Sequence, residues 1–220
     1  QVGDVVVYTQ PTCSYAEYTA VATSAVVPVP KGVDLEIAVA AMGIQGMTAH
    51  YLVSDAPAGL IQAGEWCLIY SVASGTGQWA AQMAKLKGYK VIGTTSKSKT
   101  APSCCDAVIS LDKAPGQTYS DYTSVDIVQK VMEITNQTGV QLILDGVGQA
   151  TVDISIACLA RRGILVSFGN ASGAVPPFSL LKLLPKSAFV TRPKLNDYIA
   201  TRAERQRRCQ EILEWIQQDK

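Results

Sequence analysis

The chain has 220 residues, of which 48% are hydrophobic and 17% are charged, and its formal net charge is +1. This composition is typical of a globular protein with a sizeable apolar core, and the balanced charge predicts no general attraction to nucleic acid or to an anionic membrane. No apolar run approaches the roughly 18 residues of a membrane span, so the sequence indicates no membrane segment.

The first third of the chain predicts a small β unit that is followed by helix. A turn that leads into a strand is expected over residues 1–8, and further short strands over 14–21 and 26–30. Residues 35–51 have a helical pattern, and Gly43 and Gly46 are expected to mark the point where one helix passes to the next. A loop over residues 55–64 then leads into the central part of the chain.

Residues 66–99 predict a strand, a tight glycine turn, a helix and a second strand, which is the order of a βαβ unit. The strands are expected over 66–70 and 91–94 and the helix over 78–87. The turn, at residues 74–77, would let the backbone approach a pyrophosphate, and the helix N-terminus offers unpaired N–H groups and a positive dipole end. The alternative is that the two glycines serve only the close packing of strand and helix.

The residues after the second strand indicate which dinucleotide would bind. An NAD site usually has Asp or Glu at this place, whereas this chain has two threonines, Ser96, Lys97 and Lys99. A carboxylate would repel a 2′-phosphate, while a hydroxyl and an ammonium would bind it. The sequence therefore favours NADPH. The alternative is that both lysines belong to a solvated loop.

Strands and helices alternate through the rest of the sequence. Strands are expected over residues 107–111, 140–144, 164–168 and 188–191, and helices over 125–135 and 151–159. The alternation predicts an α/β fold with a doubly wound parallel sheet of Rossmann type. Ligands of such sheets lie beyond the carboxyl ends of the strands, so one crevice is expected to gather residues 74–77, 96–99, 145–148 and 168–173.

The C-terminal segment from Tyr198 predicts a helix with an apolar stripe and a charged outer face. Glu204 and Arg208 have the spacing of an i,i+4 ion pair. The arginines of this helix could contact RNA, but a solvated helix face is the interpretation that we favour.

Six cysteines are present, at positions 13, 67, 104, 105, 158 and 209. Their spacing matches neither a disulfide framework nor a zinc site, and we expect no bound metal. This usage suits a reducing compartment, so we expect a cytoplasmic protein. Cys67 and Cys158 are expected in the core. The adjacent Cys104 and Cys105 could be redox-active, although a reduced pair in a loop is the interpretation that we favour.

Four motifs are more specific than the rest: Q-G-M-T-A-H-Y at 45–51, A-S-G-T-G at 73–77, F-G-N-A-S-G at 168–173 and T-R-P at 191–193. Together they resemble the quinone oxidoreductase (zeta-crystallin) family of zinc-free medium-chain dehydrogenases/reductases. The resemblance implies NADPH-dependent reduction of quinones or related conjugated carbonyls by hydride transfer, usually in a homodimer. It also implies that this chain lacks the N-terminal part of the family's GroES-like β substrate domain and a C-terminal stretch.

The resemblance divides the chain into three parts. Residues 1–50 would be a remnant of the GroES-like substrate domain with its linking helix. Residues 51–196 would form the NADPH-binding Rossmann domain, and residues 197–220 a C-terminal helix that returns toward the substrate domain. Because parts of the family's substrate domain are absent, the alternative function is a non-catalytic NADPH-binding protein that acts as a sensor, a crystallin-like protein or an RNA binder.

The resemblance also implies which residues bind the cofactor. Thr48 would lie beside the nicotinamide, residues 73–77 would hold the pyrophosphate, and residues 168–172 would flank the nicotinamide. Ser96 and Lys99 would hold the 2′-phosphate. The full expected set is Thr48, Ala73, Ser74, Gly75, Thr76, Gly77, Ser96, Lys99, Gly146, Val147, Phe168, Gly169 and Ser172.

We assign no catalytic residue, because hydride transfer to a quinone depends on proximity and a dry pocket more than on an acid or a base. His50 is the single histidine and lies in an apolar helical context, so a packing or hydrogen-bonding role is expected. Asp145 could act as a base, but a place in the loop at a strand end, near the cofactor, is the interpretation that we favour.

Overall fold

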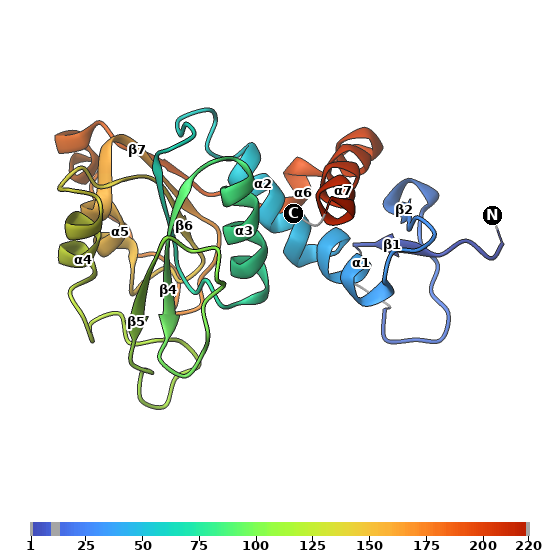
Figure 1. Cartoon of the computed structure of the whole chain (residues 1–220), viewed down its shortest axis with the longest axis horizontal. Coiled ribbons are helices and arrows are strands. Elements are labelled where there is room, and N and C mark those ends of the chain that lie inside the picture. The colour runs from blue at the N-terminus through green and yellow to red at the C-terminus, as the bar shows by residue number, and fades with distance from the viewer. Residues whose placement is uncertain (1, 10–13, 219–220) are drawn as a thin grey trace.

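A computed structural model describes residues 2–9 and 14–218 of the chain, and its architecture is α/β (Figure 1). The elements outside the main sheet are β1 (Val6–Tyr8), η1 (Thr23–Ala25), β2 (Val26–Pro28), α1 (Leu35–Met42), α2 (Ile44–Ser54), α6 (Leu195–Tyr198) and α7 (Arg202–Gln217). The main sheet and its connections are β3 (Trp66–Ile69), α3 (Gly75–Leu86), β4 (Lys90–Ser96), β5 (Ala107–Leu111), α4 (Ile127–Ile134), β6 (Val140–Asp145), α5 (Val152–Cys158), β7 (Leu159–Ser167), η2 (Leu180–Lys186) and β8 (Phe189–Thr191).

The main sheet has six strands in the order β5-β4-β3-β6-β7-β8, and every neighbouring pair is parallel. The chain starts in the middle at β3, builds outward to β5, then crosses back to β6 and builds outward to β8. This order confirms the predicted doubly wound sheet of Rossmann type. It has its switch point between β3 and β6, where ligands of such sheets bind beyond the carboxyl ends of the strands.

The side chains of β3 alternate between two separate apolar cores, one on each face of the sheet. Cys67 and Ile69 face the core that contains α3, whereas Leu68 faces the core that contains α4 and α5. A continuous apolar run is therefore needed, because both faces of a parallel strand are buried. Figure 1 shows α3 and α2 on one side of the sheet and α4 and α5 on the other.

The N-terminal β unit is smaller than the sequence predicts. β1 and β2 form a two-stranded antiparallel sheet in which Val7 lies opposite Val27, and both side chains are buried. The strand expected over residues 14–21 is wrong: the part that is described there is irregular, and Tyr15 and Tyr18 are exposed. A strand needs a partner backbone and a face to bury, and this segment has neither within the described residues.

The predicted change from one helix to the next within residues 35–51 is present, but it occurs at Gly43 alone. Gly46 lies inside α2, where a Cβ would overlap the carbonyl oxygen of Ala41, so glycine is needed there for close contact with α1. Among the described residues, no single helix is both long and apolar enough to cross a membrane, while α1 and α2 pass that test only jointly, as a pair bent by 46°.

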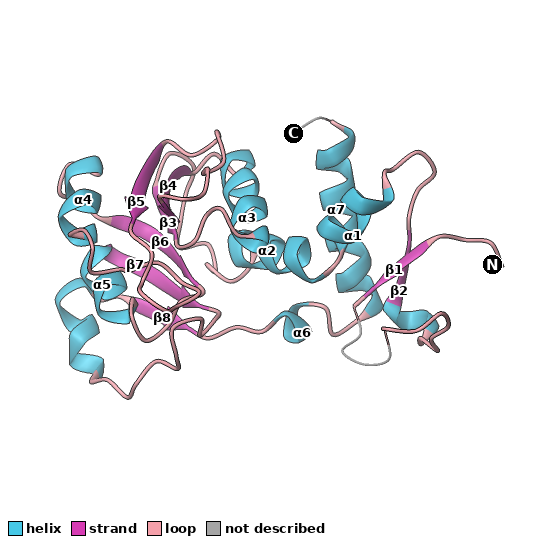
Figure 2. Ribbon diagram, turned by 90° about the horizontal axis from the view of Figure 1, so that it is seen from below, coloured by secondary structure: helices cyan, strands magenta, loops and turns pink. Residues whose placement is uncertain are grey.

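The C-terminal helix α7 packs on α1 and α2 (Figure 2), and its charges pair differently from the prediction. Glu204 accepts hydrogen bonds from Thr201 in a capping box at the helix start. Arg208 is 2% exposed and binds Asp55 at the end of α2. The expected ion pair between Glu204 and Arg208 is therefore wrong, because the helix cap and a buried partner on α2 take the two groups.

Candidate functional site

The turn between β3 and α3 is tightly held. Ser71 has a left-handed backbone with φ of 54°, and its N–H donates to Thr94 Oγ1 on β4. Ser74 is the N-cap of α3, and its hydroxyl accepts the N–H of Gly77 at 3.1 Å. The helix thus begins at Gly75, three residues before the predicted start, and its first N–H groups point out of the helix end without acceptors in the helix.

Both glycines of the turn lie in close contacts, as the packing alternative requires. A Cβ at Gly77 would lie 2.5 Å from the carbonyl oxygen of Ser71. A Cβ at Gly75 would overlap the side-chain amide of Gln45 on α2. Gly77 therefore lets α3 start against the turn, and Gly75 lets α2 approach the helix end.

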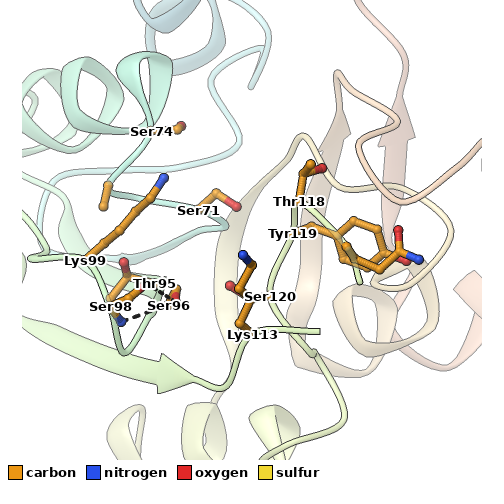
Figure 3. Close-up of a pocket in the computed structure, with 12 residues that line it drawn as sticks. Ser71, Ser74, Thr95, Ser96, Ser98, Lys99, Lys113, Thr118, Tyr119 and Ser120 are labelled. Carbon is orange, nitrogen blue, oxygen red and sulfur yellow. Dashed lines mark hydrogen bonds between the residues drawn. The ribbon is translucent and has the colours of Figure 1, made fainter. Parts of the chain in front are cut away.

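A cleft of about 350 Å³ opens in front of this turn, at the carboxyl ends of β3, β4 and β5. Figure 3 shows Lys99 on one wall, extending toward the side of Ser71 and Ser74, and Lys113 and Ser120 across the opening. The described residues that line it include no carboxylate; they are Ser71, Ala73, Ser74, Thr95, Ser96, Ser98, Lys99, Lys113, Gln117, Thr118, Tyr119 and Ser120. The cleft is thus polar and cationic, and it suits an anion.

The two lysines that follow β4 have different surroundings. Lys97 Nζ lies 2.8 Å from Asp112 Oδ1, so its charge is paired outside the cleft. The side chain of Lys99 lines the cleft. Its backbone N–H donates to the carbonyl oxygen of Ser96 at 2.9 Å, which closes the turn. Within the described part of the chain no carboxylate pairs with the Lys99 ammonium. The structure therefore separates the two candidates and places Lys99 in the cleft.

The opposite wall of the cleft was missed by sequence reasoning. It comes from the loop between β5 and α4, where Lys113 and Ser120 form an isolated antiparallel bridge. The segment has no hydrophobic period, and a loop between a strand and a helix carries no local signal that it lies beside a glycine turn. Proximity to the cleft follows only from the sheet order.

Apart from Thr48 on α2, the remaining predicted residues lie in the loops that follow β6 and β7. A second cavity of about 320 Å³ lies beside these loops, but none of the remaining predicted residues lines it. It is lined by Asp145, Ser167, Asn170 and Arg192 together with apolar side chains. All four predicted loops are at the carboxyl edge of the sheet, but they contribute to two separate cavities rather than to one crevice.

The loops after β6 and β7 are joined by a dense hydrogen-bond network. Asp145 is 1% exposed and accepts the N–H of Val147 at 2.8 Å and the hydroxyls of Thr151 and Ser155. Ser172 Oγ donates to the carbonyl oxygen of Val147 at 2.9 Å. These contacts use the Asp145 carboxylate to hold the loop in place. Its role is therefore structural, which agrees with the interpretation that we favour over a role as a base.

Two further contacts fix the loop that follows β7. The ring of Phe168 lies where a side chain on Gly146 would be, so Gly146 leaves room for it. Arg192 donates to the carbonyl oxygens of Ser167 and Gly169, at 3.1 and 3.0 Å. Gly146, Phe168 and Gly169 are therefore brought together, as the sequence motifs predict.

A family model and curated relatives both match most of this chain. A family model described as a zinc-binding dehydrogenase matches residues 75–218. The chain belongs to this dehydrogenase family. Quinone oxidoreductase of Pseudomonas aeruginosa is 35% identical over 99% of this chain and 64% of its own length. Quinone oxidoreductase 1 of Escherichia coli is 35% identical over 97% of this chain and 63% of its own length. These relatives confirm the resemblance to the quinone oxidoreductases among the medium-chain dehydrogenases/reductases.

Solved structures support the same fold. The quinone oxidoreductase of Pseudomonas syringae pv. tomato superposes with a TM-score of 0.84 at 31% identity, and the match covers 100% of this chain and 65% of that one. The Escherichia coli quinone oxidoreductase, solved in complex with NADPH, superposes with a TM-score of 0.75 at 35% identity over 88% of this chain and 56% of that one. This chain spans just under two thirds of the length of these relatives.

In this chain, Thr48 and His50 lie on different sides of α2. Thr48 is half-buried, one helical turn beyond Gln45, whose side chain meets the start of α3. His50 is fully buried, and its Nε2 lies 2.8 Å from Glu211 Oε2 while its Nδ1 lies 3.0 Å from Arg208 Nη1. Burial lowers the pKa of His50 from 6.5 to about 4. The expected hydrogen-bonding role of His50 is confirmed.

The five cysteines that the structure describes show no feature of a reactive or metal-binding group. Cys67 and Cys158 are buried in the core, as predicted. Cys104 and Cys105 are half-buried, and burial raises the pKa of both thiols, that of Cys105 to about 12. They are protonated at neutral pH and therefore weak nucleophiles. Across the described ranges, no group of three or more His, Cys, Asp or Glu side chains could hold a metal ion. Cys13 lies outside the described residues.

Proposed function

We propose that the chain binds NADPH in the cleft in front of the glycine turn and that it serves hydride transfer to a quinone or a related conjugated carbonyl. The observation that carries the proposal is the absence of a carboxylate from the described lining of a cleft into which Lys99 projects. A 2′-phosphate is recognised by positive charge, and an acid at this place would repel it. The NADPH complex of the Escherichia coli relative supports the same cofactor.

The proposed binding residues divide along the cofactor. Residues 73–77 would receive the pyrophosphate at the N-terminus of α3, where unpaired N–H groups and the helix dipole attract an anion. Ser96 and Lys99 would bind the 2′-phosphate. Thr48, Gly146, Val147, Phe168, Gly169 and Ser172 would lie toward the nicotinamide end.

The chemistry would then need little from acids or bases. Bound NADPH would supply a hydride. The protein would hold the cofactor in place and keep water away from the hydride acceptor. The apolar side chains around Asn170 and Arg192 in the second cavity offer a surface of this kind. Asp145 would act indirectly, by fixing the loops that flank the nicotinamide.

We further propose the domain division and assembly that the family motifs imply. Residues 51–196 would be the NADPH-binding domain, residues 1–50 part of the substrate domain, and residues 197–220 the returning helix. Among the strands that the structure describes, β8 pairs only with β7, and Phe189 and Val190 on it are 43% and 38% exposed. An apolar edge strand of this kind favours pairing with a second copy, so we propose a homodimer.

Replacement of Lys99 tests the cofactor assignment. A hydrogen bond to a charged group contributes roughly 1.5–3 kcal/mol, so Lys99→Ala should weaken NADPH binding by about 10- to 150-fold. NADH lacks the 2′-phosphate, so its affinity should hardly change. Calorimetric titration with both cofactors measures the difference. Lys97→Ala removes the same charge two residues away, from a side chain already paired with Asp112, and is the matched control.

The outcomes of this titration separate the possibilities. Equal losses for NADPH and NADH, or tighter NADH than NADPH binding by the unchanged chain, would contradict the assignment. Activity is tested separately, by following NADPH absorbance in the presence of a simple benzoquinone. Selective NADPH binding without turnover would favour the alternative of a non-catalytic NADPH-binding protein.

A further inference from the structure

The loop between β5 and α4 is folded into a hairpin that forms one wall of the cleft. Lys113 and Ser120 form its antiparallel bridge, and the N–H of Asp121 donates to the carbonyl oxygen of Asp112 at 2.7 Å. A turn closes its tip, where the N–H of Gln117 donates to the carbonyl oxygen of Ala114. The segment therefore has a defined shape, which orients Lys113 toward the cleft that it lines.

The hairpin is also attached to the glycine turn through the residue that follows it. Tyr122 is 3% exposed, and its hydroxyl lies 3.1 Å from Ser71 Oγ. Its ring packs edge-on against Tyr70, with centroids 5.6 Å apart. Ser124 secures the base of the hairpin, because its hydroxyl accepts the N–H of Asp112 and donates to the carbonyl oxygen of Asp121. The two walls of the cleft are thus held in a fixed relation.

The charges in the cleft favour a ligand group with more than one negative charge. A phosphate monoester carries about −1.5 to −2 at neutral pH. The charged side chains of the described lining are Lys99 and Lys113, one from each wall. Asp112, the nearest acid in sequence to Lys113, is paired with Lys97. Lys99 alone would leave a 2′-phosphate incompletely neutralised, whereas the two ammonium groups together match it.

We propose that Lys113 is a second specificity-determining residue for the 2′-phosphate, supplied by the hairpin opposite Lys99. The proposal rests on the assigned NADPH site and adds a residue from a wall of the cleft that no motif of the chain marks. Ser120 lies beside Lys113 on the same wall and offers a hydroxyl to the same group. Selectivity for NADPH over NADH would then depend on both walls rather than on the turn after β4 alone.

Two fragments from the adenosine half of the cofactor, which differ only in the 2′-phosphate, provide the probe. Adenosine 2′,5′-bisphosphate carries the 2′-phosphate, and adenosine 5′-monophosphate is the same molecule without it. We expect Lys113→Ala to weaken binding of the bisphosphate by about tenfold or more and to leave the monophosphate unchanged. Lys113→Glu should weaken binding of the bisphosphate further. The exposed Lys130 on α4 provides the control, since Lys130→Ala removes the same charge away from the cleft.

Calorimetry with the full chain distinguishes the outcomes, and circular dichroism checks that each variant is folded. If Lys113→Ala and Lys113→Glu bind the bisphosphate as tightly as the unchanged chain while Lys99→Ala does not, the role of Lys113 is refuted and the NADPH site stands. If both probes lose affinity equally, Lys113 is not specific for the 2′-phosphate. If the unchanged chain does not prefer the bisphosphate, the NADPH site itself fails, and Lys113 with it.

Discussion

Acidification from pH 7 to pH 4 is expected to weaken the attachment of α7 to α2 through His50. A guanidinium can only donate, so His50 Nδ1 accepts from Arg208, and Nε2–H donates to Glu211. The buried ring is therefore neutral, and burial lowers its pKa from 6.5 to about 4. The unfolded chain takes up this proton below pH 6.5 and the folded chain only near pH 4. The stability associated with a neutral His50 is thus complete above pH 6.5 and is lost as the pH falls.

The magnitude follows from the size of the shift. One proton taken up only by the unfolded state changes the free energy of unfolding by about 1.4 kcal/mol per pH unit. Between pH 7 and pH 4 the loss through His50 amounts to about 3 kcal/mol. Asp55 and Glu211 face the same cluster, so a variant is needed to isolate the imidazole.

Urea unfolding of the unchanged chain and of His50→Gln, at pH 7, 6, 5 and 4, provides the assay. Trp215 stacks on His50 with ring centroids 5.4 Å apart and contributes to the fluorescence together with Trp66 and Trp79, while circular dichroism reports on global unfolding. We expect the stability difference between the two proteins to fall by about 3 kcal/mol from pH 7 to pH 4. A difference that stays constant over this range would refute the neutral, buried imidazole.

Two further predictions concern the turn and the sheet edge. Gly77→Ala places a methyl group against the rigid carbonyl of Ser71 and should lower the free energy of unfolding by about 1–3 kcal/mol in thermal unfolding. Gly75→Ala meets only the flexible Gln45 side chain and should lower it by less. Equal losses of stability would contradict the packing argument. Val190→Lys on β8 puts a charge on the proposed dimer edge and should halve the mass seen by light scattering; a monomeric mass for the unchanged chain would contradict the dimer.

The central βαβ unit could be predicted because its signals lie between neighbouring residues. The apolar run from Trp66 suits a strand that is buried on both faces, and Leu68 and Ile69 indeed face opposite cores. Ser74 is an N-cap residue by type, and its hydroxyl caps α3. The absence of an acid after β4 is likewise visible without a structure, and it remains the strongest argument for NADPH.

Equivalent local signals did not distinguish the two glycines of the first helical region. Gly43 and Gly46 are both poor helix residues, yet Gly43 separates α1 from α2 while Gly46 is helical. The difference arises because α1 passes so close to Gly46 that a Cβ would overlap Ala41. The strand expected over 14–21 failed for a related reason, since a strand needs a partner that only the fold can provide.

Sequence alone therefore predicted the sheet, the glycine turn and, through the missing acid after β4, the NADPH preference that we propose, while the fold decided which charged groups meet. Lys97 and Lys99 are equivalent in sequence, but only Lys97 reaches Asp112, on the strand-end next to it, and Lys99 is left for the cleft. Arg208 binds Asp55 rather than Glu204, and Lys113 joins the cleft from a hairpin with no motif. Long charged side chains take partners from segments that the topology brings near, whether the pair is exposed, as between Lys97 and Asp112, or has a buried member, as between Arg208 and Asp55.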